Sequence, residues 1–192
     1  MSESLTKQLL VAMPALHDPN FSRTVTLICE HNEHGAMGIV VNQPITLCVD
    51  ELIRYLDVDA DDVEVNDQDT ASVHNPVYAG GPVHANRGFV LHDSDRKWTS
   101  TYTIDDDLKL TTSEDILVDI GRGIGPRNAI VALGYAGWGP GQLEQELVDN
   151  AWLTVPYQAK IVFDTPVEKR WQSAASKLGI DLNLISNEAG HA

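Results

Sequence analysis

Cys29, His31 and His34 form the first group of residues in the sequence that could do chemistry. A thiolate and two imidazoles are ligands that zinc accepts, and on a strand Cys29 and His31 would share one face. Zinc sites usually have a fourth ligand, however, and the sequence has no paired Cys-x-x-Cys motif to supply one. We therefore predict no metal site and no cofactor, and we interpret the group as a buried thiol beside a histidine whose ring organises a hairpin through backbone hydrogen bonds.

The acidic stretch from Asp57 to Asp69 starts with the Asp-x-Asp-x-Asp spacing of a calcium-binding loop. Such a loop needs glycine at its sixth position and glutamate at its twelfth. Here those positions hold Asp62 and Gln68. The stretch is therefore predicted to be a solvated surface loop rather than a cation site.

The segment 134–141 is the richest in glycine and lies between a predicted strand and a predicted helix, which is where phosphate-binding loops occur. It lacks the Lys-Ser/Thr of a P-loop and the spacing of a dinucleotide-binding loop, and Pro140 removes one N–H donor. An architectural turn that packs Trp138 onto the core is therefore favoured over a ligand cradle.

Gly80 and Gly81, followed by Arg87, form the second glycine-rich candidate. Paired glycines permit a turn, a bulge or the close approach of a ligand. Arg87 is a cation in an acidic chain, so it can pair with a carboxylate or bind an acidic ligand. The candidate ligand-binding residues from the two segments are Gly80, Gly81, Arg87, Gly137, Trp138, Gly139 and Gly141.

Apolar periodicity predicts the elements that would position these residues. Strands are predicted at 9–12, 24–29, 37–41, 77–79, 88–91, 101–104, 108–110, 129–133, 152–155 and 161–163, and helices at 47–56, 115–120, 142–150 and 167–178. The second and third strands, joined by a polar turn, predict a hairpin. Thr111 with Glu114 three residues later predicts a capping box that opens the second helix.

The composition is that of a globular, acidic protein, and the predicted elements indicate one α+β domain spanning residues 1–192. Its 13 basic and 28 acidic residues give a formal net charge of -15, which disfavours nonspecific nucleic-acid binding and binding to anionic membranes. The N-terminal residues do not resemble a secretory signal, no apolar run is long enough to span a bilayer, and there are only two cysteines. We therefore expect a cytoplasmic monomer with free thiols.

Several motifs, in this order along the chain, together resemble the YqgE/AlgH family of bacterial proteins. They are Met13-Pro14, His31-Asn32, Gly35–Gly38, Asn42-Gln43-Pro44, Gly80–Val83, Leu91-His92, Gly134–Trp138, Gln142–Glu144, Asn150–Trp152, Phe163-Asp164 and Gly190–Ala192. The resemblance implies a mixed, strongly bent, partly barrel-like sheet rich in hairpins, with about four helices outside it, and no settled biochemical activity. Some members carry a transcriptional-regulator label, which the sequence supports little because it has no helix-turn-helix pattern and no basic stripe.

Two functions from different classes fit these observations. The first is a non-enzymatic binding or regulatory module that holds an unknown small ligand or protein partner. The alternative is a hydrolase-type enzyme whose groups come from Cys29, His31, His92 and Arg87. A nucleophile and a base about 3 Å apart in a cleft would favour the enzyme.

Overall fold

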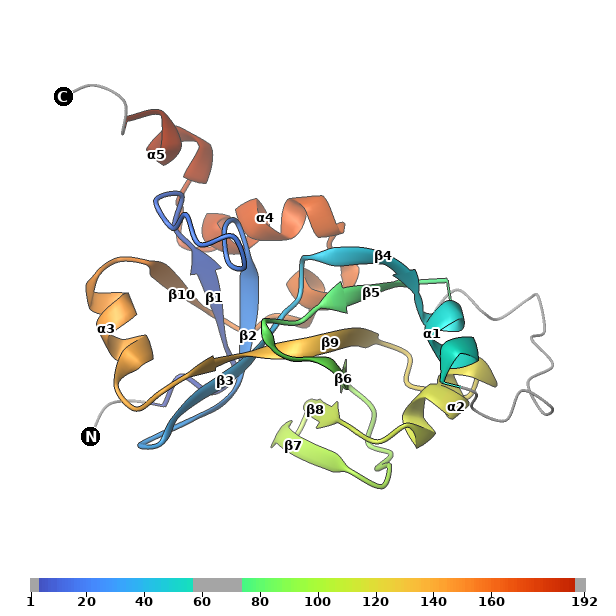
Figure 1. Ribbon diagram of the computed structural model, residues 1–192. Coiled ribbons are helices and arrows are strands. Elements are labelled where there is room, and N and C mark those ends of the chain that lie inside the picture. The colour runs from blue at the N-terminus through green and yellow to red at the C-terminus, as the bar shows by residue number, and fades with distance from the viewer. Residues whose placement is uncertain (1–3, 57–73, 189–192) are drawn as a thin grey trace.

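The computed structural model describes residues 4–56 and 74–188 and shows one curled β-sheet with helices packed against it (Figure 1). The strands are β1 (Gln8–Ala12), β2 (Val25–Asn32), β3 (Gly35–Val40), β4 (Pro44–Cys48), β5 (Pro76–Ala79), β6 (Val83–His92), β7 (Thr101–Asp105), β8 (Leu108–Thr111), β9 (Ala129–Trp138) and β10 (Trp152–Pro156). The helices are α1 (Val49–Tyr55), α2 (Asp115–Gly121), α3 (Gln142–Val148), the π-helix η2 (Lys160–Asp164), the 3-10 helix η3 (Val167–Lys169), α4 (Arg170–Ser176) and α5 (Leu182–Glu188). The predicted acidic loop at 57–69 lies outside the described residues.

The ten strands form one mixed sheet in the order β10-β1-β2-β3-β9-β6-β8-β7, with β4 and β5 joined at its side. β9 lies at the centre, antiparallel to β3 and β6 and parallel to β5. The sheet curls into a half-barrel, as expected for a single α+β domain with a strongly bent sheet. The predicted hairpin of β2 and β3 is confirmed, with a bulge at Cys29 between the pairs Ile28–Gly38 and Glu30–Met37.

Apolar side chains on both faces of the sheet form three buried clusters, which explains why the strands read as nearly continuous apolar runs. The largest cluster lies inside the curl, where η2 and α4 pack Ile161, Val162 and Trp171 against β1, β2, β3 and β9. The second lies under α1 and α2, and the third under α3 around Trp138 and Trp152. The helices therefore cover separate parts of a single sheet (Figure 1).

Two local predictions of secondary structure are wrong. Residues 134–138, predicted as a loop, are the second half of the ten-residue strand β9, because Ala136, Gly137 and Trp138 pair with β3. Residues 161–163, predicted as a strand, form the π-helix η2, in which Ile161 and Val162 are buried side by side. A short run of β-branched residues suits either a strand or a buried helix, and here packing inside the curl selects the helix.

The predicted capping box of α2 is also absent. Thr111 is the last residue of β8, and its hydroxyl forms hydrogen bonds to His92 and Thr101 instead of capping the helix. The helix begins after Glu114, whose backbone carbonyl accepts hydrogen bonds from the N–H groups of Leu117 and Val118. Two elements were not predicted, the strand β4 and the helix α5. With α5, the described residues hold five α-helices, where about four helices were expected.

Candidate functional site

Strand β6 contains a wide bulge that positions the candidate site. Val83 pairs with Tyr135 and Gly88 pairs with Leu133, so residues 84–87 lie opposite the single residue Gly134. These four residues are exposed, and His84 has a positive φ of 48°, which a residue other than glycine rarely adopts. Bulges commonly redirect side chains beside functional sites, and this one leaves His84, Asn86 and Arg87 exposed.

Two clefts flank this bulge. The first, which we call the helix-side cleft, has a volume of about 410 Å³ and lies between β6 and helices α1 and α2. It is lined by Leu52, Leu56, His84, Asn86, Arg87, Gly88, Val90, Thr111, Thr112, Ser113, Glu114, Leu117, Val131 and Leu133. The second, the sheet-side cleft, has a volume of about 610 Å³. It is lined by Cys29, Glu30, Ala36, Met37, Val83, His84, Arg87, Phe89, Tyr102, Leu110, Thr112, Tyr135, Gly137 and Trp138.

His84, Arg87 and Thr112 line both clefts, so the bulge forms the ridge between them. The Arg87 guanidinium lies 5.7 Å from the centre of the Phe89 ring, a cation–π distance. It forms no ion pair with any residue in the described parts of the chain, whereas Arg54, Arg96 and Lys109 each pair with an aspartate. Arg87 is therefore an exposed cation whose charge is available to a ligand in either cleft.

Cys29 lies in the floor of the sheet-side cleft but is fully buried. Burial raises the pKa of its thiol to about 12, partly offset by a hydrogen bond from the backbone of Ile39. The thiol donates a weak hydrogen bond to the Leu27 carbonyl, with the sulfur 3.7 Å from the oxygen. At neutral pH this group is therefore a thiol rather than a nucleophilic thiolate.

His31 is held by hydrogen bonds at both ring nitrogens. Its Nδ1 accepts a hydrogen bond from the Leu5 backbone N–H at 2.9 Å, so the proton is on Nε2, which donates to Glu144 Oε1 at 3.0 Å. A backbone N–H and this histidine together lower the pKa of Glu144. The ring thus has a structural role, as predicted, but it joins the N-terminal segment to α3 instead of organising the β2–β3 hairpin.

His92, the last residue of β6, is fully buried. Its Nε2 is 2.8 Å from the Thr111 hydroxyl, and its ring meets the Trp98 ring edge to face at a centroid distance of 5.0 Å. Burial, together with the nearby charge of Lys109, lowers the pKa of His92 to about 4. The imidazole is therefore neutral at pH 7.

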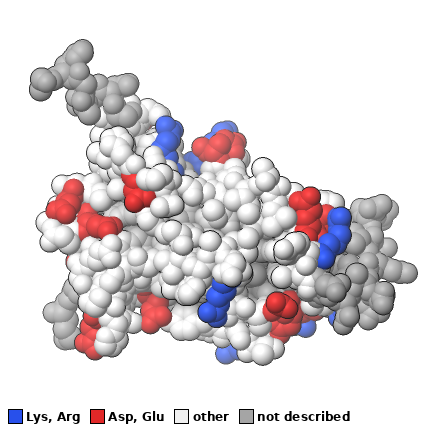
Figure 2. All heavy atoms as spheres, viewed as in Figure 1, with Lys and Arg blue, Asp and Glu red and all other residues white. Residues whose placement is uncertain are grey.

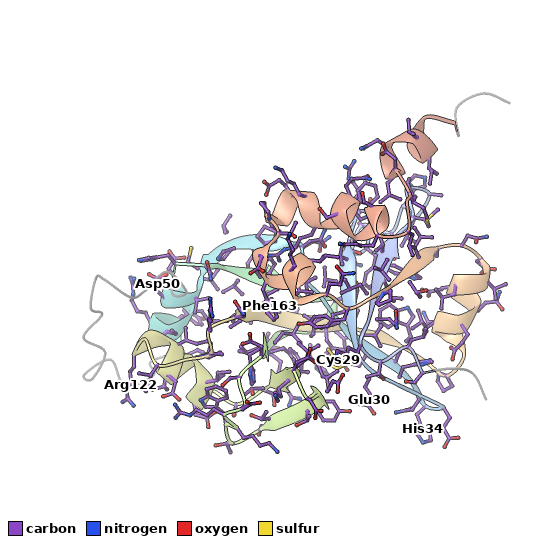
Figure 3. All side chains as sticks on the ribbon, turned by 180° about the vertical axis from the view of Figure 1, so that it is seen from behind. Cys29, Glu30, His34, Asp50, Arg122 and Phe163 are labelled. Carbon is purple, nitrogen blue, oxygen red and sulfur yellow. The ribbon has the colours of Figure 1, made fainter. Side chains whose placement is uncertain are left out.

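The groups proposed for a hydrolase do not assemble in the described structure. No hydrogen bond there joins Cys29, His31, His92 or Arg87 to another member of the set. Figure 3 shows Cys29 inside the molecule and His34 at the tip of the β2–β3 hairpin, where its side chain is 85% exposed. The described residues contain no group of three or more His, Cys, Asp and Glu side chains with the geometry to hold a metal ion.

Gly80 and Gly81 lie where the β5–β6 connection crosses the backbone of β9. A Cβ atom on Gly80 would come within 2.4 Å of the Gly134 carbonyl oxygen, and one on Gly81 within 2.1 Å of the Tyr135 carbonyl carbon. Close packing of two backbones therefore explains both glycines, and neither lines a cleft described above.

The other glycine-rich candidates fall in two places. Gly137 is in β9 and lines the sheet-side cleft beside Trp138, whose residue is only 6% exposed and whose indole N–H donates to Glu146 at 2.9 Å. Gly139 and Gly141 form the turn into α3, where Gly141 is the left-handed residue before the helix. The packed position of Trp138 agrees with the architectural interpretation of this segment.

Most of the residues that line the two clefts could not be predicted as site residues from the sequence. His84, Tyr102, Thr112 and Tyr135 belong to four different segments and meet only because the sheet curls. A histidine with positive φ cannot be read from residue types, so the bulge was not predictable. Of the seven candidate residues, Arg87, Gly137 and Trp138 lie at the clefts.

These features define a class of protein: a single-domain α+β protein with a half-barrel sheet and paired clefts at its central strands. A family model described as AlgH-like matches residues 9–183, and the chain belongs to this family. It is 50% identical over 191 residues to a UPF0301 protein of Thioalkalivibrio sulfidiphilus, covering 100% of this chain and 98% of the relative. A UPF0301 protein of Methylococcus capsulatus is 46% identical over 190 residues, 99% and 97% of the two chains.

Two solved structures share the fold. The solution structure of the AlgH protein from Pseudomonas aeruginosa matches with a TM-score of 0.77 and 45% identity, covering 100% of this chain and 99% of that one. A crystal structure of a Corynebacterium diphtheriae protein matches with a TM-score of 0.70 and 20% identity over 97% and 93% of the chains, which shows the fold alone.

Within the described residues, each helix is too short or too polar to cross a bilayer. Family membership by itself carries no biochemical activity, so the function has to be argued from the site.

Proposed function

We propose that this protein is a non-enzymatic binding module that holds a small anionic ligand in the clefts beside the β6 bulge, and that its role is regulatory. The observation that carries the proposal is Arg87, an exposed guanidinium that lines both clefts and has no ion-pair partner among the described residues. In a chain of net charge -15, an unneutralised cation in a cleft favours an anion over a cation or a nucleic acid.

The helix-side cleft fits the body of such a ligand. Its volume lies within the range of small-molecule sites, and its walls are apolar side chains, among them Leu52, Val90 and Leu117. Asn86, His84 and Thr112 on the bulge and the opposite wall add a few polar groups that can orient the ligand. An apolar body with one carboxylate or phosphate directed at Arg87 suits this lining.

Two further observations support a binding role in the cytoplasm rather than on nucleic acid. On the face shown in Figure 2, basic side chains are few and scattered, with acidic groups between them, so that face has no basic stripe. Cys29 and Cys48 are both free thiols, as a reducing compartment allows. We propose that the protein acts there as a monomer and regulates a partner through ligand occupancy.

A ligand screen tests the proposal. Wild type is screened by thermal shift against a library of small carboxylates and phosphates, because a ligand at 100 times its Kd stabilises the fold by about 2.7 kcal/mol. Arg87→Gln is expected to abolish the shift produced by a hit. Arg127→Gln removes an exposed arginine that lines neither cleft and is expected to keep it. Hits that stabilise Arg87→Gln as strongly as wild type would refute binding at the bulge.

A further inference from the structure

A separate polar pocket lies at the C-terminal end of the fold, away from the β6 clefts. It has a volume of about 360 Å³ and lies between η2, the residue Gln158 that precedes it, and the C-terminal half of α4. Its polar lining includes Lys160, Lys177, Gln158, Gln172, Ser173 and Ser176, and no aspartate or glutamate is among the described residues that line it.

The absence of acidic groups in this lining is unusual for the chain. Aspartate and glutamate outnumber lysine and arginine 28 to 13 overall, whereas residues 158–181 carry four basic and three acidic side chains. Neither Lys160 nor Lys177 forms an ion pair within the described structure. Two ammonium groups at one pocket without a carboxylate leave a positive charge that a bound anion would neutralise.

The two lysines come from different elements: Lys160 is the first residue of η2, and Lys177 directly follows α4. The Thr165 N–H donates to the Lys160 carbonyl at 2.9 Å, which closes the wide turn of the π-helix and fixes the position of Lys160. π-helical turns are rare and occur frequently at functional sites. On α4, the Gln172 side chain is anchored to Ser176 and to the Leu182 N–H, whereas Ser173 and Gln158 have no side-chain hydrogen bond in the described structure.

We infer that this pocket binds the phosphate monoester of a small, hydroxylated molecule. The two lysines balance a phosphate dianion as point charges, and the Ser173 hydroxyl and Gln158 amide are free to donate to its oxygens or to hydroxyl groups of the ligand. The volume exceeds what inorganic phosphate alone requires. A soluble ester is favoured over a lipid headgroup because a chain of net charge -15 is repelled by an anionic membrane surface.

NMR titration of the full chain tests this inference. At a constant ionic strength set with sodium chloride, glycerol 3-phosphate is expected to shift the amide signals of Gln158, Ser173 and Lys177, with inorganic phosphate binding several-fold more weakly. The double variant Lys160→Gln/Lys177→Gln is expected to weaken binding at least tenfold. Lys169→Gln, which removes an exposed lysine on η3 outside the pocket, is the matched control and should bind like wild type.

Three outcomes would overturn the inference. They are no shift at these residues, the same affinity in the double variant, or shifts that sodium chloride alone reproduces. The amide spectra also report whether each variant is folded, so a loss of binding cannot be mistaken for a loss of structure. Binding of anionic vesicles by this pocket, with no response to the soluble ester, would assign it to a membrane and would likewise reject the soluble ligand.

Discussion

At the scale of single residues, the carboxylate of Glu146 on α3 links two buried tryptophans. One of its carboxylate oxygens accepts the indole N–H of Trp138 at 2.9 Å and that of Trp152 at 2.8 Å. Both tryptophan residues are more than 90% buried, so neither N–H can turn to bulk water. The carboxylate is therefore what allows two adjacent indoles to pack under α3.

Glu146→Ala is expected to lower the free energy of unfolding by about 2–4 kcal/mol, because it leaves two buried donors without an acceptor. Urea denaturation followed by tryptophan fluorescence measures the change. Gln145→Ala is the matched control, because Gln145 is exposed on the same helix and bonds only Asp149, and it should cost well under 1 kcal/mol. An equal decrease in the free energy of unfolding for the two variants would show that the buried packing of the indoles does not depend on the Glu146 carboxylate.

His92 predicts a pH dependence of stability. Its pKa is about 4 in the folded protein and about 6.5 when unfolded, so between these values the unfolded chain binds more protons. Stability from the neutral imidazole is therefore complete above pH 6.5 and is lost as the pH falls toward 4, by up to about 3 kcal/mol.

Free energies of unfolding at pH 7 and pH 4.5 measure this loss in wild type and in His92→Gln. The variant keeps a polar group opposite Thr111 but does not titrate, so it is expected to lose less stability than wild type over this interval. Carboxylates titrate in both proteins and cancel in the difference. A fall of the same size in both would mean that His92 is not the group responsible.

At the scale of elements, the crossing of the β5–β6 connection over β9 decides where the clefts form. Gly134 has a φ of +74°, and a Cβ atom there would lie 2.3 Å from the Gly81 carbonyl oxygen. Only glycine suits both the conformation and the space, so β9 can bend at this point while β6 bulges opposite it. The bulge that carries Arg87 depends on this contact.

Gly134→Ala is expected to destabilise the fold by more than 3 kcal/mol or to prevent folding, because strain at positive φ adds to a backbone clash. Gly141→Ala has the same sign of φ (+73°) but open space around its Cβ, so it should cost only about 1–2 kcal/mol. Gly139→Ala has neither problem and should be nearly neutral. Melting temperatures of the three variants provide the comparison. If Gly134→Ala lowered the melting temperature no more than Gly141→Ala, the proposed backbone clash at the crossing would be wrong.

At the scale of the whole molecule, the C-terminal segment completes the core that the first strands begin. The Trp171 indole N–H on α4 donates to the Ala12 carbonyl of β1 at 2.8 Å, and Ile161 and Val162 fill the same cluster. One cluster contains side chains from β1 to α5. Detaching either terminal segment from the sheet would therefore expose the apolar side chains of the other segment to water.

Thermal unfolding is therefore expected to be one cooperative transition, detected by calorimetry with equal calorimetric and van't Hoff enthalpies. Reductant and EDTA should shift the melting temperature by less than about 1 °C, because both cysteines are free thiols and the described residues hold no cluster of metal ligands. Two separated transitions, or a large loss of stability with EDTA, would disprove this description.

The sequence alone determined the features that depend on local patterns. Alternation of β-branched residues before and after a polar turn was enough for the β2–β3 hairpin, and the apolar run 129–133 was enough for the first half of β9. The composition identified an acidic globular chain, apolar periodicity predicted its α+β class, and ordered motifs identified its family, which the comparisons confirm. Local steric preferences and burial on one sheet face act over a few residues, so these features can be read from the chain.

Only the tertiary structure decided where the polar and charged groups meet. Arg87 was a candidate from its charge, but its place on a ridge between two clefts depends on a bulge set by Gly134, which lies 47 positions later in the chain. Lys160 and Lys177 lie at one pocket because residues 160–164 form a π-helix inside the curl rather than the predicted strand. Such sites depend on contacts between segments far apart in the chain, and the energy of those contacts outweighs local preference.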